Sequence, residues 1–426
     1  MTSTPATPPP TIGSGHEGDV KDQFLAYFRN LRQGEMGALP ALGGFIVLVI
    51  LFAFLSQQFL TPLNLANLLT QSATLMTLAV ALVFVILLGE IDLSAGVTSG
   101  VGAAVFVTLV HNSHINWILA LAIAFAVGLA IGTFIGFFVA RVGIPSFVVT
   151  LGLFLGFQGL QLLIIGRGGA YRIETPEVSA IMNRNLPVPL GWTLLAVAIA
   201  IALAISLWDR RRRSKAGVAN RPLILMVARL GAITVAGVLF VALMSVDRAA
   251  GRGELNGVPI AHDAIIGVPI VVPFAVGILW IGTFVLDRTK YGRHLYAVGG
   301  NPEAARRAGI RVASIRLIAF VICSTLAVVA GIFDASRIGV VTAASGNSIV
   351  LSGVAAAVVG GVSLFGGRGR VVHAAIGALV IAVIANGLGL LGLPAGVNFL
   401  VTGGVLILAA TIDAVSRKRA GGTLIR

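Results

Sequence analysis

Twelve long apolar runs, separated by short polar segments, fill most of this 426-residue chain. A helix needs about 20 apolar residues to cross the hydrocarbon core of a bilayer, and most of the runs reach that length. Backbone groups inside a bilayer must pair within the protein, so lone spans of this length fold as helices. The sequence therefore predicts an all-α polytopic membrane protein. The runs lie at 40–59, 64–88, 95–111, 117–140, 146–165, 190–208, 223–245, 264–286, 315–333, 349–365, 371–391 and 395–412.

Two of these runs, 95–111 and 349–365, are short and rich in glycine. Either one is expected to be a span or a broken, re-entrant segment, which leaves 10 to 12 transmembrane helices. The 53 glycines of the chain suit both close packing between membrane helices and unwound helices around a cavity. Charged residues make up 11% of the chain, against about 25% in soluble domains. The single cysteine, Cys323, is expected to be a small buried apolar side chain.

Lysine and arginine predict the orientation, because cytoplasmic loops are enriched in both. With the N- and C-termini both cytoplasmic, 24 of the 30 basic residues lie inside, many of them in segments such as the basic loop 208–222. The net charge of +14 then reflects loops that face an anionic leaflet, and a nucleic-acid partner is not expected. The predicted division is a disordered or surface-bound cytoplasmic tail at 1–38, a membrane domain at 39–413 and a cytoplasmic tail at 414–426. A short polar helix along the membrane surface is expected at 21–38.

The longest polar excursion between two apolar runs is 287–316, and it predicts a short helix with both ends marked. Asn301 is a good N-cap residue, Pro302 fits the first helical position and Glu303 suits the positive helix start. Two arginines follow, and Gly309 fits the left-handed conformation that closes a helix. Such a helix, held between two spans, is either a docking element or part of a solvated basic loop.

The block from Gly292 to Ala305 resembles the cytoplasmic coupling loop of bacterial ABC sugar-importer permeases, a family that includes the ribose and xylose permeases. Glu303-Ala304-Ala305 matches the Glu-Ala-Ala signature that the ATPase subunit grips. A second block, Gly89 to Gly96, resembles the other hallmark of the family. The resemblance implies ATPase coupling for Gly292, Arg293, Gly299, Gly300, Asn301, Glu303, Ala304, Ala305, Arg306 and Gly309. It implies a gate or signature turn formed by Gly89, Glu90, Asp92, Leu93, Ser94 and Gly96.

The resemblance spans about residues 64 to 419, and the xylose-type permease is the nearest match, with extra length around the basic loop. It implies a bacterial inner-membrane importer for xylose or a related pentose. Two permease subunits, expected to be a homodimer, form its pathway. ATP and Mg belong to a separate ATPase subunit, and a soluble sugar-binding protein delivers the substrate. No cofactor is expected on this chain.

Glu90 and Asp92 stand out among the sixteen acidic residues, because the others fall in the tail or in evident loops. An ionisable group at membrane depth is functional by default, which makes this turn part of a gate or a cavity floor. The alternative is a wetted turn in which Asp92 caps a helix that begins near Ser94. The block also resembles residues 360–367, either as the trace of a repeated half or by chance.

Neutral polar residues inside the runs are the candidate pathway groups: Asn67, Gln71, Gln158 and Asn386. Asn67, Gln71 and Thr74 are spaced to share one helix face. Such groups either hydrogen-bond sugar hydroxyls or join helices to one another.

No P-loop, metal-ligand spacing or catalytic constellation is present in the sequence, so neither an enzyme nor a metal site is expected. The competing hypothesis is an ion-coupled secondary transporter or a channel. The scarcity of acidic residues within the spans argues against proton coupling.

Overall fold

The computed structural model describes residues 39–166, 169–217, 222–249, 254–255, 258–259 and 264–422, with the side chains of 254–255, 258–259 and 416–422 left out. The predicted tail at 1–38, including the surface helix at 21–38, lies outside these residues.

Helices form almost all of the described chain, which confirms the all-α polytopic prediction. Within the described ranges, nine helical segments are long and apolar enough to span a membrane. They are α3 (Pro62–Ile86), α5 (Trp117–Phe137) with its π-helical end η1 (Phe138–Val142), α6 (Ser146–Ile165), α8 (Val188–Lys215), α9 (Leu223–Met244), α10 (Val271–Arg288), α13 (Val312–Ile338), α15 (Val371–Leu390) and α16 (Ala395–Gly422). Three further apolar helices are shorter: α2 (Leu39–Leu55), α4 (Ala95–His111) and α14 (Ile349–Val359). Each predicted run therefore contains a helix.

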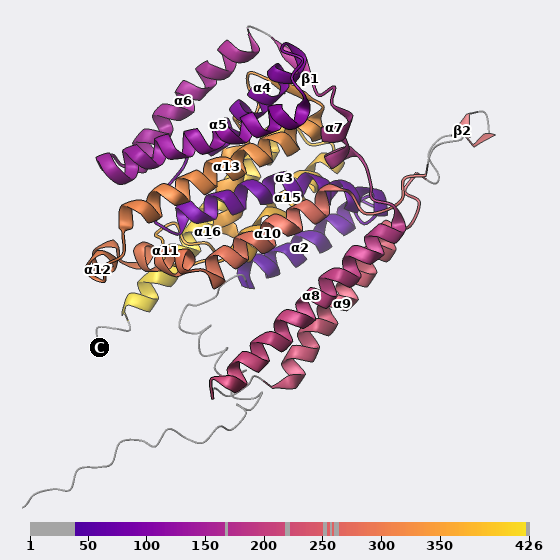
Figure 1. Cartoon of the computed structure of the whole chain (residues 1–426). Coiled ribbons are helices and arrows are strands. Elements are labelled where there is room, and N and C mark those ends of the chain that lie inside the picture. Colours follow the sequence, from indigo (N-terminus) through magenta and orange to yellow (C-terminus); the bar gives the residue numbers. More distant parts are fainter. Residues whose placement is uncertain are drawn as a thin grey trace, which may run out of the picture.

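Helix α13 lies at the centre of the bundle and packs against α3, α4 and α5 (Figure 1). Its contact with α5 is close because three glycines four residues apart, Gly128, Gly132 and Gly136, line the facing side of α5. A methyl group added at Gly132 would lie 2.5 Å from the Cα atom of Val321, and one added at Gly136 would lie 2.8 Å from that of Leu317. The glycine excess therefore serves close helix packing here, as in other membrane bundles.

Helices α4 and α14 both begin inside the bundle. Gly96, in the first turn of α4, packs against the carbonyl oxygen of Gly346 and the side chain of Val350, just before and at the start of α14. Helix α14 has 11 residues, about 16 Å, which is too short to cross a bilayer. Of the two alternatives predicted for the run 349–365, a span or a broken segment, the structure favours the broken segment, because the chain leaves the helix after Val359 and turns through glycines.

Helices α8 and α9 form an antiparallel hairpin that leans away from the other helices (Figure 1). The predicted basic loop 208–222 is partly wrong, since α8 continues through the arginines to Lys215. Arginine and lysine are good helix formers and are favoured near a helix C-terminus, so the helix extends beyond its apolar part. Helix α16 continues to Gly422.

The connections opposite the coupling segment contain short strands. β1 (Ala170–Arg172) pairs antiparallel with β4 (Val340–Thr342), and β2 (Glu254–Leu255) pairs with β3 (Val258–Pro259). Helix α7 (Pro176–Asn183) follows β1 and packs on the end of α13.

Candidate functional site

The segment 287–316 contains two helices, α11 (Lys290–Gly300) and α12 (Pro302–Arg307). The predicted caps of α12 are confirmed: the side chain of Asn301 accepts a 2.9 Å hydrogen bond from the Ala304 N–H, and Gly309 has φ of 83°. Helix α11 was not predicted from the sequence. The sequence signal for its start is Thr289, a good N-cap residue, whose hydroxyl accepts a 3.2 Å hydrogen bond from the N–H of Gly292.

One face of this pair of helices is anchored and the other is exposed. Ala305 is buried against the main apolar core, whereas Glu303 and Ala304 are exposed beside Arg306 and Arg307. Glu303 forms surface ion pairs with both arginines, at 3.2 and 3.4 Å. The exposed face is therefore free to meet a partner, while the buried face holds the element in place.

The anchoring of α11 depends on close backbone contacts. A methyl group at Gly299 would collide with the carbonyl oxygen of Leu87, whereas one at Gly300 would meet open space. The hydroxyl of Tyr296 donates a 2.8 Å hydrogen bond to the carbonyl of Gly369. Burial raises the pKa of Tyr296 to about 12, which further favours the protonated hydroxyl that donates this bond. Helix α11 thus rests on the end of α3 and on the glycine-rich turn before α15.

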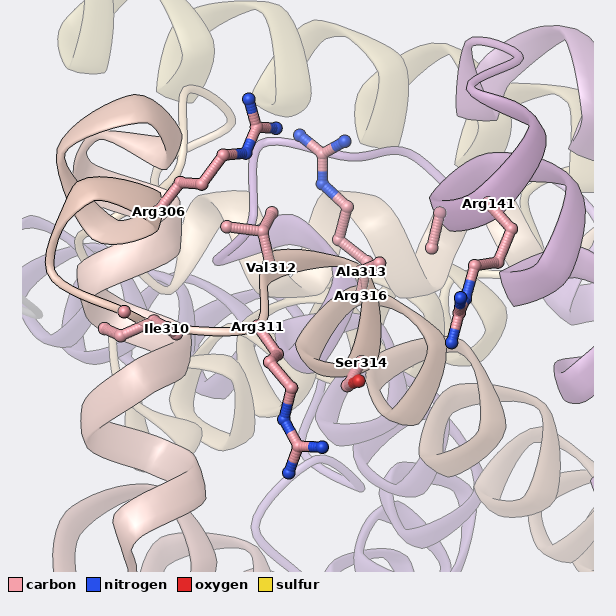
Figure 2. A pocket seen from close by; sticks show the side chains of 10 residues that line it. Arg141, Arg306, Ile310, Arg311, Val312, Ala313, Ser314 and Arg316 are labelled. Carbon is pink, nitrogen blue, oxygen red and sulfur yellow. The ribbon is translucent and has the colours of Figure 1, made fainter.

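A cavity of about 440 Å³ lies beside α12 and is lined by four arginines. Figure 2 shows Arg306 and Arg316 directing their guanidinium groups to one side of the connecting segment, and Arg141 and Arg311 directing theirs to the other. Sequence reasoning placed only Arg306 in this group. The cavity and the exposed face of α12 together present a basic surface.

The signature turn leads from the surface of the bundle, where Gly89 and Ile91 are exposed, to its interior. Asp92 is fully buried, and one carboxylate oxygen lies 3.6 Å from the thiol of Cys323. Cys323 is eleven residues along α13, about 16 Å from the first residue of that helix. The wetted-turn alternative is therefore wrong for Asp92. Its other oxygen accepts bonds of 2.9 and 2.7 Å from the N–H and hydroxyl of Ser94, the residue before α4, so Asp92 forms a turn ahead of the helix and not the predicted cap.

The extended chain before α4 has its backbone groups satisfied by α6. Ser146 accepts a 3.2 Å hydrogen bond from the N–H of Ile91, and Thr150 donates one of 3.3 Å to the carbonyl of the same residue. Non-helical backbone at membrane depth persists only where such partners exist. Sequence reasoning missed both residues, although their spacing of four in an apolar run was a signal. Of the turn's other members, Gly89 has φ of 74°, Leu93 is half-buried and Gly96 is buried.

The two segments that resemble each other in sequence lie side by side. The N–H of Gly367 donates a 2.8 Å hydrogen bond to the carbonyl of Leu87, just before the signature turn. Ser363 accepts a 3.4 Å bond from the N–H two residues ahead, as Asp92 does in the matching position. The aligned glycines Gly89 and Gly360 differ in conformation, with φ of 74° and −64°, so the repeat stays a prediction.

The four candidate pathway residues are not brought together. Asn386 and Asn64 exchange two hydrogen bonds of 2.9 Å, so Asn386 joins α15 to α3. Asn67 is exposed on α3 and Gln158 is half-buried on α6. Gln71 lines a cavity, together with Thr74 on the same helix face.

That cavity has a volume of about 210 Å³ and lies between α3, α13, α14, α15 and α16. Its apolar wall includes Ile381 and Phe399. One acidic residue, Asp334, belongs to α13 and not to a loop as expected, and it pairs with Arg337 at 3.2 Å. The polar lining consists of Gln71, Thr74, Asp334, Arg337, Ser352, Asn398 and Thr402.

Comparison with known proteins identifies the family. A family model described as the branched-chain amino acid transport system permease component matches residues 64–223 and 178–410. The xylose transport system permease protein XylH of Escherichia coli (strain K12) is 32% identical over 397 residues, covering 92% of this chain and 95% of that protein. The ribose import permease protein RbsC of Bacillus subtilis (strain 168) is 30% identical over 380 residues, covering 89% and 94%. No solved structure matches the chain. These relatives confirm the resemblance to ribose and xylose permeases, and the chain belongs to the family of the branched-chain amino acid transport system permease component.

Proposed function

We propose that this chain is the translocation subunit of an ABC importer for xylose or a related pentose. The names of the xylose and ribose relatives support the substrate class. The observation that carries the proposal is the position of α12, a capped helix with an exposed outer face and an anchored inner face. Such an element suits a permease that is driven by another protein better than an ion-coupled carrier.

The ATPase subunit docks on α12 and brings the ATP and Mg. Glu303 and Ala304 form the contact, and the basic cavity beside them receives acidic side chains of the ATPase. Movement of α12 is transmitted because α11 rests on Leu87, close to the signature turn. The signature turn then positions the start of α4 inside the bundle.

The α12 end of the bundle faces the cytoplasm in this proposal, with both termini on that side. The basic residues around α12 agree with the enrichment of arginine and lysine in cytoplasmic segments. The soluble sugar-binding protein docks at the opposite end, and two copies of the permease enclose the pathway. The chain then sits in a bacterial inner membrane, where its exposed apolar helices contact lipid.

The test is co-purification with a tagged ATPase subunit from membranes that contain both proteins. Ala304→Arg places a bulky cation in the contact, and Glu303→Ala removes its acidic group, so both are expected to lower recovery of the permease. Ala395→Arg makes the same change on an exposed alanine at the other end of the bundle and is expected to leave recovery unchanged. If both α12 variants still co-purify at the wild-type level, the assignment of the ATPase contact is wrong.

A further inference from the structure

The 210 Å³ cavity between α3, α13, α14, α15 and α16 receives polar groups in pairs from three different helices. Gln71 and Thr74 are three residues apart on α3, and Asn398 and Thr402 are four apart on α16. Asp334 and Arg337 form the third pair, on α13. Helical spacings of three and four place both members on one helix face, so each helix presents a polar face to the same cavity.

Thr74 is the buried polar member of the cavity lining. It is 2% exposed, and its hydroxyl has no hydrogen-bond partner among the described residues. Several other threonines in these helices donate to the carbonyl four residues earlier, as Thr70 and Thr77 do at 2.9 and 2.8 Å. A buried hydroxyl without a partner costs free energy, which a ligand in the cavity would recover.

The position of the cavity suits cargo that arrives from the end opposite α12. Gln71 lies nine residues along α3, about 14 Å from the first residue of that helix, and Ser352 lies in the first turn of α14. Helix α14 begins inside the bundle, and broken helices of this kind border substrate sites in many transporters. Polar groups at membrane depth face a cavity where they serve a function.

The chemistry of the lining specifies a small neutral polyol. Arg337 is paired with Asp334 at 3.2 Å, so the cavity offers no uncompensated cation for a phosphate group. Amides and hydroxyls both donate and accept, as sugar hydroxyls require, and Phe399 gives an apolar wall for the C–H face of a ring. The volume is below the roughly 300–1,000 Å³ of pockets for drug-sized ligands, which suits a single sugar ring.

We infer that this cavity is a binding site for one unphosphorylated monosaccharide within the permease, with Gln71 and Thr74 as direct hydrogen-bond partners. The inference rests on the proposed sugar cargo. It adds a holding site inside the membrane between delivery of the sugar and its release.

Xylose uptake by the complete importer in vesicles tests this site, with ATP hydrolysis stimulated by the binding protein as a second readout. Thr74→Val keeps the shape of the side chain and removes the hydroxyl. It is expected to lower uptake about three- to tenfold, as for one lost hydrogen bond, with ATP hydrolysis unchanged. Thr74→Ser keeps the hydroxyl and is expected to restore uptake. Gln71→Leu removes the neighbouring amide from the cavity and is also expected to lower uptake. Asn67→Leu makes the same change one helical turn earlier, outside the cavity, and is the matched control.

Protection of an introduced thiol tests occupancy without transport. Ser352→Cys places a thiol in the cavity, while the native Cys323 is fully buried. Xylose is expected to slow labelling of Ser352→Cys by a small thiol reagent, and to leave labelling of Asn67→Cys unchanged.

The site is overturned, and the import function kept, by one set of results. In that set the wild-type importer takes up xylose, Thr74→Val and Gln71→Leu take it up at the normal rate, and xylose does not protect the thiol. A wild-type importer that moves no pentose and gives no protection overturns the sugar function as well. Protection without pentose uptake supports the site and contradicts only the proposed import.

Discussion

A carboxylate oxygen of Glu90 lies 3.2 Å from Nε of Arg316, and this ion pair joins the signature turn to the end of the coupling segment. The Arg316 Nε–H makes no aligned hydrogen bond, so the contact is mainly coulombic. The two side chains are 14% and 28% exposed, which leaves the pair only partly screened by water. The two sequence blocks that resemble permease hallmarks are thus linked by charge.

A double-mutant cycle measures this link. Glu90→Gln and Arg316→Gln are each expected to lower ATP-driven sugar uptake, because each leaves one half-buried charge unpaired. The double variant is expected to lose less than the sum of the two, with a coupling free energy of about 1 kcal/mol. The measurement is uptake at equal permease content in vesicles. Strictly additive losses would show that the pair carries no coupling.

The buried carboxylate of Asp92 is expected to matter for transport more than for assembly. Asp92→Asn keeps one oxygen for Ser94 but turns an amide nitrogen toward Cys323, which is expected to slow uptake about two- to tenfold. Asp247→Asn is the control, since Asp247 accepts the same bond from the N–H two residues ahead in the connection between α9 and α10. Unchanged co-purification with the ATPase checks assembly. Normal transport by Glu90→Gln combined with Asp92→Asn would leave the turn a purely structural role.

Alanine substitution at the adjacent glycines Gly299 and Gly300 in α11 is expected to affect coupled transport very differently. Gly299→Ala forces a methyl group into the carbonyl oxygen of Leu87, so α11 must shift away from the end of α3. Gly300→Ala meets open space and changes helix propensity by the same amount. We expect Gly299→Ala to uncouple ATP hydrolysis from sugar uptake and Gly300→Ala to behave as wild type. Equal uptake by the two variants would contradict transmission through this contact.

The close approach of α5 to α13 predicts that alanine substitution lowers the stability of the protein at Gly132 but not at Gly152. Gly132→Ala brings a methyl group within 2.5 Å of the Cα atom of Val321, and overpacking of this kind costs about 1–3 kcal/mol. Gly152→Ala on α6 meets nothing within 4 Å and gains the same helix propensity. Thermal unfolding in detergent is expected to show a lower midpoint for Gly132→Ala alone. A midpoint equal to that of Gly152→Ala would mean that the two helices separate at little cost.

The selectivity of the importer is expected to reside mainly in the sugar-binding protein. Where one pentose lacks a hydroxyl that another offers, the amides and hydroxyls around a cavity can hydrogen-bond to water instead. Their discrimination between pentoses is therefore expected to be small. A chimeric importer that combines this permease and its ATPase with a binding protein for another sugar, with a matched docking surface, checks this point. Uptake of the new sugar at a comparable rate supports the expectation. A chimera that docks and stimulates ATP hydrolysis, yet moves only the original sugar, would place the selective step inside the membrane.

Features that depend on local signals could be read from the sequence alone. Apolar length predicted where helices form, because a span buries its own backbone hydrogen bonds. The ends of α12 were equally readable, since Asn301 caps an N–H three residues ahead and Gly309 closes the same short helix. Two short motifs were enough to indicate the family.

The roles of the polar residues inside the spans depend on how the helices pack. Asn386 and Gln71 are both amides in apolar helices, yet one is bonded to Asn64 across 322 positions and the other faces a cavity. Asp92 meets Cys323, which lies 231 positions away. Contacts with lipid and with a neighbouring helix both require apolar side chains, so a span's sequence does not reveal which face meets which partner. Helix packing sets those distances, and through them it separates structural amides from cavity-lining ones.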